Sequence, residues 1–159
     1  NITPYGTETM HVLRAEKGFI IVGQDTDGSV TPSDMNMDWI VSKKKEDFLG
    51  KRSFTRSDTV RHDRKKFVGL LVNDKKTILP EGSHIVEKAL KQPPMKMLGH
   101  VTSSYYSPTL GYPIALAMLK DGLSKMGEQV VVPLMNGKII EATVTDTIFY
   151  DKEGKRNNE

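Results

Sequence analysis

From Phe67 onward, the chain consists of short runs of strand-forming residues separated by turns that contain Gly and Pro. Runs of this length with alternating apolar positions are typical of half-buried strands. The expected strands cover 67–72, 84–86, 96–104, 114–119, 130–135 and 138–144, with a break at the Pro93-Pro94 doublet. Asn136-Gly137 predicts a hairpin with a type I′ turn, which needs positive φ at both central residues. Five or six short antiparallel strands in roughly 85 residues predict a small barrel or sandwich.

The first part of the chain has a different pattern, which predicts helices mixed with a strand. Residues 11–22 begin as a helix, and Gly18 suits its C-terminal cap. Thr31 is expected to cap a short helix that starts at Pro32. The β-forming run 39–41 predicts a strand, and the side chain of the single Trp is expected to be buried in the core between two structural units. Asp47 is expected to start a second helix that ends near Ser57.

The polar stretch Asp58–Lys65 lies between these two patterns and is the expected linker. We therefore predict an α+β chain with a small α/β unit over residues 1–63. An antiparallel β-barrel with a tail is predicted over residues 64–159. The chain begins without Met and reads as interior sequence by Leu13, so we expect a piece of a longer protein.

Several functional classes are excluded or disfavoured by what the sequence lacks. The chain has no Cys, so disulfides, zinc–thiolate sites and thiol nucleophiles are excluded. No apolar run approaches the roughly 20 residues of a membrane span, and no signal peptide is visible, so we expect a cytoplasmic protein. The four histidines lack the spacing of metal ligands, and the loop around Asp25 and Asp27 lacks the other ligands of a calcium loop, so no metal site is expected. No nucleotide-binding motif and no serine-nucleophile motif occurs in the sequence.

Positive charge is concentrated between Lys43 and Lys66, a stretch that contains ten Lys or Arg residues and only four Asp or Glu residues. One interpretation is a solvated face between the two units. Another is an electrostatic funnel for an anionic ligand, such as one with a glutamate tail, or a contact with a partner subunit. We expect no nucleic acid, because acids interrupt the basic run and no aromatic stacking pattern accompanies it.

Two long phrases carry a family resemblance. LRAEKGFIIVGQDTDGSVTP, from Leu13, and the following MDWIVSKKKEDFLGKRSF resemble the junction segment of the glycine cleavage T-protein (aminomethyltransferase) family. LGHVTSSYYSPTLGYPIALAML, from Leu98, resembles the C-terminal barrel of the same family. Within that superfamily, the variants in these phrases and the tail 149–156 are most similar to the C-terminal part of the alpha subunit of heterotetrameric sarcosine oxidases. The resemblance runs from about His11 to Arg156.

The resemblance implies a tetrahydrofolate-binding module that captures a one-carbon unit as 5,10-methylene-tetrahydrofolate. Residues 1–63 would be part of the folate-binding domain and residues 64–159 its C-terminal barrel. The implied partners are other sarcosine oxidase subunits, especially the flavin-bearing beta subunit. FAD, FMN and NAD would belong to the intact multisubunit enzyme, outside this chain. The family's catalytic aspartate lies upstream of the matched phrases, so we assign no catalytic residue and expect the isolated chain to be inactive.

The resemblance also implies a role for individual residues. Arg14 matches the arginine that binds the glutamate carboxylate of folate, for which the bidentate guanidinium is suited. The alternative for Arg14 is an internal ion pair with Glu16 or another nearby acid. Gln24 and Asp25 are expected to fix the loop that follows.

Tyr106 and Tyr112 flank the turn in the barrel phrase and could line the mouth of the folate site, although tyrosines of small barrels more often pack. Two other functions stay open. The chain could be a fragment of an aminomethyltransferase that works with a lipoyl carrier protein, or a non-catalytic barrel that docks against other subunits.

Overall fold

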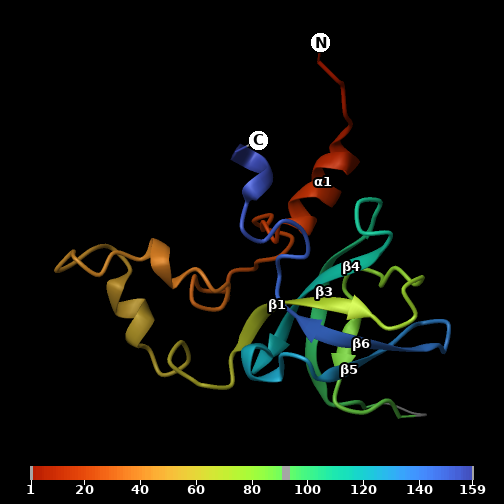
Figure 1. Cartoon of the computed structure of the whole chain (residues 1–159). Helices are drawn as coiled ribbons and strands as arrows, with labels where there is room; N and C mark the ends of the chain where they lie inside the picture. Colours follow the sequence, from red (N-terminus) through yellow and green to blue (C-terminus); the bar gives the residue numbers. More distant parts are fainter. Residues whose placement is uncertain (1, 91–93, 159) are drawn as a thin grey trace.

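The computed structural model describes residues 2–90 and 94–158, which form one α-helix and a six-stranded barrel (Figure 1). The helix, α1, spans Thr7–Glu16. The strands are β1 (Lys65–Val72), β2 (His84–Val86), β3 (Met97–Ser107), β4 (Tyr112–Lys120), β5 (Gln129–Pro133) and β6 (Ile139–Thr145). They pair antiparallel in the order β1-β4-β3-β2-β5-β6, and β6 pairs with β1 to close the barrel. The predicted α+β class with a C-terminal antiparallel barrel is confirmed.

Every strand expected from Phe67 onward is present, and the ends differ from the expected ones by at most three residues. The barrel closes because both edges of the sheet find a partner, which leaves no edge strand unpaired. The expected break at the Pro93-Pro94 doublet falls partly outside the described residues, because Pro93 is among those not described.

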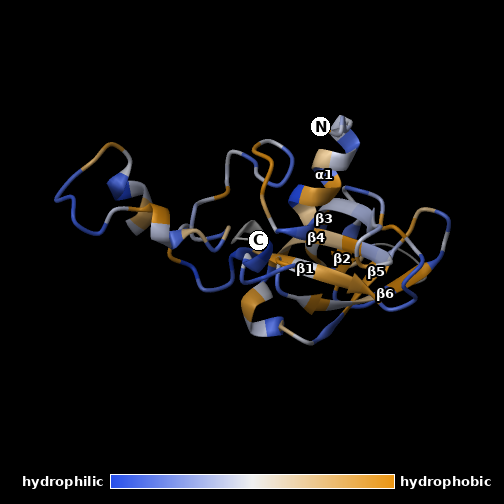
Figure 2. Cartoon of the chain, turned by 45° about the horizontal axis from the view of Figure 1, so that its top comes forward, coloured by the Kyte–Doolittle hydropathy of each residue, from blue (hydrophilic) through white to orange (hydrophobic). Residues whose placement is uncertain are grey.

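The barrel interior is filled by alternate side chains of its strands, as the period-two pattern predicts. Apolar residues are concentrated on the strands, most visibly along β1 (Figure 2). The interior cluster includes Val68, Leu70 and Val72 of β1 together with Ala115, Ala117 and Leu119 of β4.

A second apolar cluster lies on the outer face of the barrel. Phe67, Leu116 and Met118 alternate with the interior positions and therefore point outward, where Ala15 of α1 and Met35 cover them. Strand β4 is consequently buried on both faces along most of its length. This outer cluster attaches the N-terminal segment to the barrel.

Helix α1 ends in a Schellman motif at Gly18, as expected from the sequence. Gly18 has φ +69° and its N–H donates to the carbonyl of Ala15 at 3.1 Å, while the Phe19 N–H donates to the carbonyl of Arg14 at 2.8 Å. A Cβ at Gly18 would lie 2.7 Å from the carbonyl oxygen of Thr147. Gly18 is therefore required both by the left-handed backbone and by the close approach of the C-terminal segment.

The helix expected after Thr31 is reduced to a turn. The carboxylate of Asp34 accepts from the N–H and the hydroxyl of Thr31, both at 2.9 Å, so the predicted capping interaction is present. Asn36 then adopts the left-handed conformation with φ +59°, which ends the turn before a helix can form. The prediction of a helix at this point was wrong because it did not anticipate this reversal.

The expected strand at 39–41 and the buried Trp were also wrong. Residues Asp38–Ile40 form a 3₁₀ turn, and Trp39 is 78% exposed. The second helix expected from Asp47 is replaced by a 3₁₀ turn over Lys51–Thr55, which follows Gly50 at φ +93°. Figure 1 shows this segment as an arm that extends away from the barrel, so the described residues provide no core for the indole to enter.

The hairpin between β5 and β6 is present, but its turn is not type I′. Only Gly137 of the central pair has positive φ (+80°); Asn136 does not. The Gly137 N–H donates to the carbonyl of Leu134 at 3.0 Å, and the Leu134 N–H donates to that of Lys138 at 2.8 Å. This pattern describes a three-residue loop with Gly in the left-handed position, the next most common hairpin type.

Candidate functional site

Arg14 lies in the last turn of α1, and its guanidinium extends toward β3, where it is almost fully buried. Its Nη1 donates to Oδ2 of Asp25 at 2.6 Å and to the carbonyl of Phe19 at 3.2 Å. Its Nη2 donates to the hydroxyl of Ser103 at 2.6 Å and to that of Tyr105 at 3.3 Å. Arg14 therefore joins the helix, the loop after it and the barrel.

Asp25 is the buried acid opposite Arg14, with only 1% of its surface exposed. Besides Arg14, its Oδ2 accepts from the N–H of Ile21 at 2.9 Å. Its Oδ1 accepts from the hydroxyls of Thr102 at 2.5 Å and Ser103 at 2.7 Å. Four donors thus surround the carboxylate, which is the condition under which burial of a charged group is tolerated.

The alternative role expected for Arg14 from the sequence is an internal ion pair. Such a pair is present, and its acid is Asp25 rather than Glu16. The Glu16 carboxylate instead accepts from the hydroxyl of Ser107 at 2.5 Å. Both terminal nitrogens of Arg14 have protein partners, whereas its buried Nε has none in the described part of the chain. A buried donor without an acceptor is uncommon and costs free energy, so this N–H is an unsatisfied donor beside the Arg14–Asp25 pair.

A polar rim surrounds the Arg14–Asp25 pair. Gln24 donates from Nε2 to Glu81 at 2.9 Å and to the hydroxyls of Ser103 at 3.2 Å and Tyr105 at 3.3 Å. The Tyr105 ring lies 5.6 Å from the Arg14 guanidinium carbon. The expectation that Gln24 and Asp25 fix this loop agrees with these bonds, since both tie it to β3.

Tyr105 was not among the candidates taken from the sequence. The hydrogen bonds of Arg14 within the described chain include Tyr105 but neither Tyr106 nor Tyr112. Tyr106 is 46% exposed, and Tyr112 packs in the outer cluster with the ammonium of Lys75 5.6 Å from its ring centre. Because side chains alternate along β3, Tyr105 and Tyr106 lie on opposite faces of the strand. Which of the two lies on the face of Arg14 depends on a register shift between Val101 and Ser103, and no local sequence signal marks this shift.

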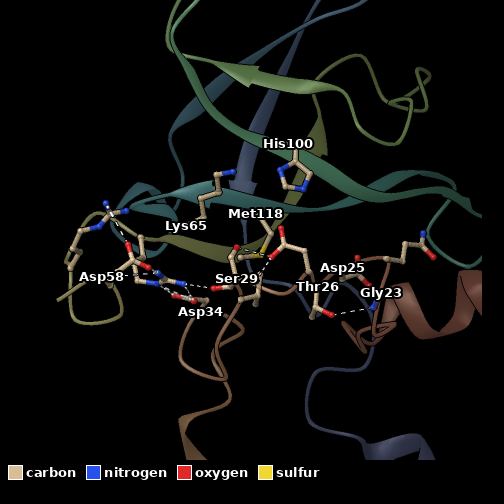
Figure 3. Close-up of a pocket in the computed structure, with 14 residues that line it drawn as sticks. Gly23, Asp25, Thr26, Ser29, Asp34, Asp58, Lys65, His100 and Met118 are labelled. Atoms are coloured by element: carbon tan, nitrogen blue, oxygen red, sulfur yellow. Dashed lines mark hydrogen bonds and ion pairs between the residues drawn. The ribbon is translucent and has the colours of Figure 1, made fainter. Parts of the chain in front are cut away.

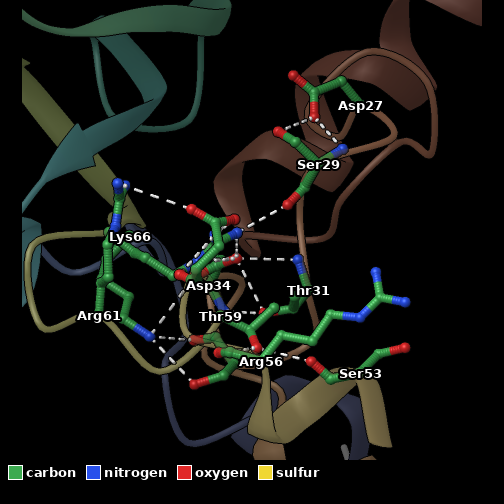
Figure 4. Close-up of polar contacts among 12 residues, drawn as sticks. Asp27, Ser29, Thr31, Asp34, Ser53, Arg56, Thr59, Arg61 and Lys66 are labelled. Atoms are coloured by element: carbon green, nitrogen blue, oxygen red, sulfur yellow. Dashed lines mark hydrogen bonds and ion pairs between the residues drawn. The ribbon is translucent and has the colours of Figure 1, made fainter. Parts of the chain in front are cut away.

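A second polar network is centred on Asp34 (Figure 4). Arg64 donates from Nη2 to Asp34 at 2.6 Å and from Nη1 to Asp58 at 2.9 Å. Burial raises the pKa of Asp34, but the hydrogen bonds from Arg64 and Thr31 outweigh it, so the net pKa is below the ordinary value. Asp34 in turn raises the pKa of Arg64. The stretch expected to be a polar linker therefore contains an arginine whose side chain is only 11% exposed.

The basic run between Lys43 and Lys66 divides into two parts. Arg64 and Lys66 turn inward, and Lys66 donates to the carbonyl of Ser33 at 2.8 Å. Lys43, Lys44 and Lys45 lie exposed in the arm. The described residues contain no group of three His, Asp or Glu side chains placed to hold a metal ion. Among the described helices, none has the length and apolar character needed to span a membrane.

Two family models match the chain. The model of the glycine cleavage T-protein C-terminal barrel domain matches residues 65–151, which is more than half of the chain and includes all six strands. The model of the GCVT N-terminal domain matches residues 1–45, which include α1, Arg14 and Asp25.

Curated relatives match nearly the whole chain. The sarcosine oxidase alpha subunit of Corynebacterium sp. (strain P-1) is 53% identical over 99% of the chain, and that of Rhizobium meliloti is 36% identical over 98%. The aminomethyltransferase of Thermotoga petrophila is 32% identical over 92%. The chain spans only 16% of the length of these oxidase subunits and 37% of that aminomethyltransferase.

A solved structure has the same fold. The aminomethyltransferase T of the glycine cleavage system from Bartonella henselae superposes with a TM-score of 0.73 over 89% of the chain and 38% of its own length. Its sequence identity is 24%, so this similarity concerns the fold.

Proposed function

The chain belongs to the glycine cleavage T-protein family, and from this premise we propose that it is the folate-binding part of a sarcosine oxidase alpha subunit. The observation that carries the proposal is the difference in identity between two groups of relatives. Alpha subunits from two Corynebacterium strains are 53% and 51% identical over 99% of the chain, whereas aminomethyltransferases reach 31–32%. The proposed role is capture of the one-carbon unit released by sarcosine oxidation.

Tetrahydrofolate is the proposed cofactor, and the residues around Arg14 fit its anionic tail. The buried Nε of Arg14 is a donor without a partner, and Gln24 and Tyr105 add polar groups beside the same guanidinium. Cationic and neutral donors of this kind suit a carboxylate. When bound, tetrahydrofolate supplies the nucleophilic amine that accepts the one-carbon unit; this chain would orient the tail.

The role of Asp25 in this proposal is to hold Arg14 in place. Asp25 fixes Nη1, and Ser103 fixes Nη2, so the guanidinium has a single orientation before any ligand arrives. Pre-organisation of this kind lowers the entropy cost of binding. Arg14 remains the proposed folate contact, with Asp25 as its positioning residue. Tyr106 and Tyr112 remain proposed folate contacts at the mouth of the site, outside the hydrogen bonds of Arg14.

An aminomethyltransferase fragment is the second candidate, supported by 32% identity over 92% of the chain. One experiment distinguishes the two. The complete protein that contains this sequence, assembled with the subunits that co-purify with it, is supplied either with sarcosine and oxygen or with an aminomethyl-loaded lipoyl carrier protein, each with tetrahydrofolate. Hydrogen peroxide together with methylene-tetrahydrofolate from the first mixture supports the oxidase. Methylene-tetrahydrofolate from the second mixture alone would overturn it in favour of the transferase.

A further inference from the structure

A cavity of about 380 Å³ lies on the outer face of the barrel and is lined on one side by Gln24 and Asp25, whereas Arg14 itself does not line it. The loop after α1, the stretch before β1 and the strands β1, β3 and β4 line it. Met118 of β4 is part of the wall, and Figure 3 shows Lys65 and His100 extending toward the same space, opposite Ser29 and Thr26. Cavities of this volume are large enough for a small organic ligand.

Most charged groups in the wall are already paired. Asp25 binds Arg14, and Asp34 and Asp58 bind Arg64. Arg61 contacts Asp58 at 3.6 Å. These pairs hold the wall together and leave little net charge for a ligand.

Three groups are not paired in this way. Neither the ammonium of Lys65 nor the imidazole of His100 has a hydrogen bond or ion pair among the described residues. Asp27 accepts from the N–H and hydroxyl of Ser29 through Oδ1, and its Oδ2 has no described partner. Lys65, His100 and Asp27 line the same cavity, and both Lys65 and His100 act electrostatically on Asp27.

We propose that this cavity binds a small carboxylate that carries a hydrogen-bond donor, a hydroxyl or an ammonium group, on the adjacent carbon. The carboxylate would lie between Lys65 and His100, both of which can donate to it. The neighbouring donor would reach Oδ2 of Asp27, which is an acceptor only. One ammonium and one imidazole beside a carboxylate thus suit a ligand that places its own carboxylate next to a hydrogen-bond donor. The inference does not rest on the folate proposal.

The surroundings of His100 provide a spectroscopic reporter for this ligand. Burial lowers the pKa of His100, the charges of Lys65 and His84 lower it further, and Asp27 raises it. A bound carboxylate would favour the protonated imidazole and raise the pKa. The His100 pKa should therefore increase when the ligand is present at constant ionic strength.

The test is an NMR titration of the 159-residue chain, with the His100 signal assigned through His100→Gln. The probes are acetate, which lacks the donor, and glycolate and glycine, which carry a hydroxyl and an ammonium group. We expect glycolate or glycine to bind more tightly than acetate and to raise the His100 pKa. Lys65→Gln should weaken that binding about tenfold, the loss expected for a charge-assisted hydrogen bond. Lys138→Gln, at an exposed hairpin position, is the matched control and should change nothing.

Asp27→Asn separates the two halves of the site. It should bring the affinities of glycolate and glycine close to that of acetate, while leaving acetate binding intact. Comparison of glycolate with glycine identifies which donor the site prefers. The proposal is overturned if His100 responds no more than the other histidines, or if Lys65→Gln binds as the wild type does. Equal affinity of all three probes for the wild type would remove the role of Asp27.

Discussion

The guanidinium of Arg14 and the carboxylate of Asp25 form a buried ion pair, with Nη1 2.6 Å from Oδ2. The pair joins the last turn of α1 to the following loop, and both partners also bind Ser103 of β3. It therefore couples the N-terminal segment to the barrel through one set of charged hydrogen bonds.

Removal of Arg14 should destabilise the chain strongly. Arg14→Met leaves Asp25 buried without its cation, and we expect the free energy of unfolding to fall by about 3 kcal/mol in urea titrations. Arg56→Met, at an exposed arginine, is the control and should change it by less than about 0.5 kcal/mol. The double variant Arg14→Met/Asp25→Leu should recover part of the loss. Equal effects of Arg14→Met and Arg56→Met would contradict the importance of the pair.

Gly18 should tolerate no side chain. Gly18→Ala combines positive φ with a Cβ 2.7 Å from the carbonyl oxygen of Thr147, so we expect a loss of about 2–3 kcal/mol. Gly23→Ala is a matched control, because Gly23 has φ +93° but no atom within 4 Å of the position that a Cβ would take. It should lose only about 1 kcal/mol, the cost of the left-handed backbone. Thermal unfolding of both variants measures the difference; indistinguishable melting temperatures would show that the contact with Thr147 is not restrictive.

Acid should weaken the Asp34 network. The pKa of Asp34 is lowered in the folded chain, so its contribution to stability is present above the ordinary value of 3.8 and is lost as the pH falls through the lower folded pKa. We expect unfolding free energy to decrease with falling pH below about 4, and less steeply in Asp34→Asn. Urea titrations at pH values between about 2 and 5 measure this slope. The same slope in the variant and the wild type would mean that other carboxylates dominate acid unfolding.

The boundary between residues 63 and 64 stays a prediction. We expect limited proteolysis to cut within residues 58–63 before it cuts the barrel, because this stretch lies outside the helix and strands and is mostly exposed. The two pieces should still elute together in gel filtration, since Ala15 and Met35 pack against Phe67 and Met118. First cleavage within residues 96–119 would show that the boundary is wrongly placed, and separation of the pieces would show that the outer cluster does not hold them.

The barrel could be predicted from the sequence because its evidence is local. The short apolar runs of β1 and β4 and the Gly-containing hairpin at Gly137 are visible within a few residues. The N-terminal part could not, because its conformation depends on single backbone reversals. Asn36 and Gly50 adopt positive φ and stop the expected helices, and Trp39 has no core to enter among the described residues.

The candidate site could be predicted only in part. The family resemblance singled out Arg14, but the acid that pairs with it lies across a reversal at Gly18. Ser103, which binds both partners, is 89 positions away from Arg14 in the sequence. Tyr105 was missed in favour of Tyr106 because the register shift in β3 decides which of the two faces Arg14. Long-range register of this kind has no signature in a single sequence.

The fate of the one-carbon unit in an assembled sarcosine oxidase that contains this chain tests the proposed function most directly. Peroxide, methylene-tetrahydrofolate and free formaldehyde are measured for the wild type, Arg14→Lys and the control Arg56→Lys. We predict equal peroxide formation in all three, and for Arg14→Lys roughly 5- to 30-fold weaker folate binding with more formaldehyde, because a Lys ammonium beside Asp25 offers no counterpart of the Arg14 Nε–H to the folate carboxylate. If tetrahydrofolate does not change the product ratio of the wild type, the proposed folate function is wrong.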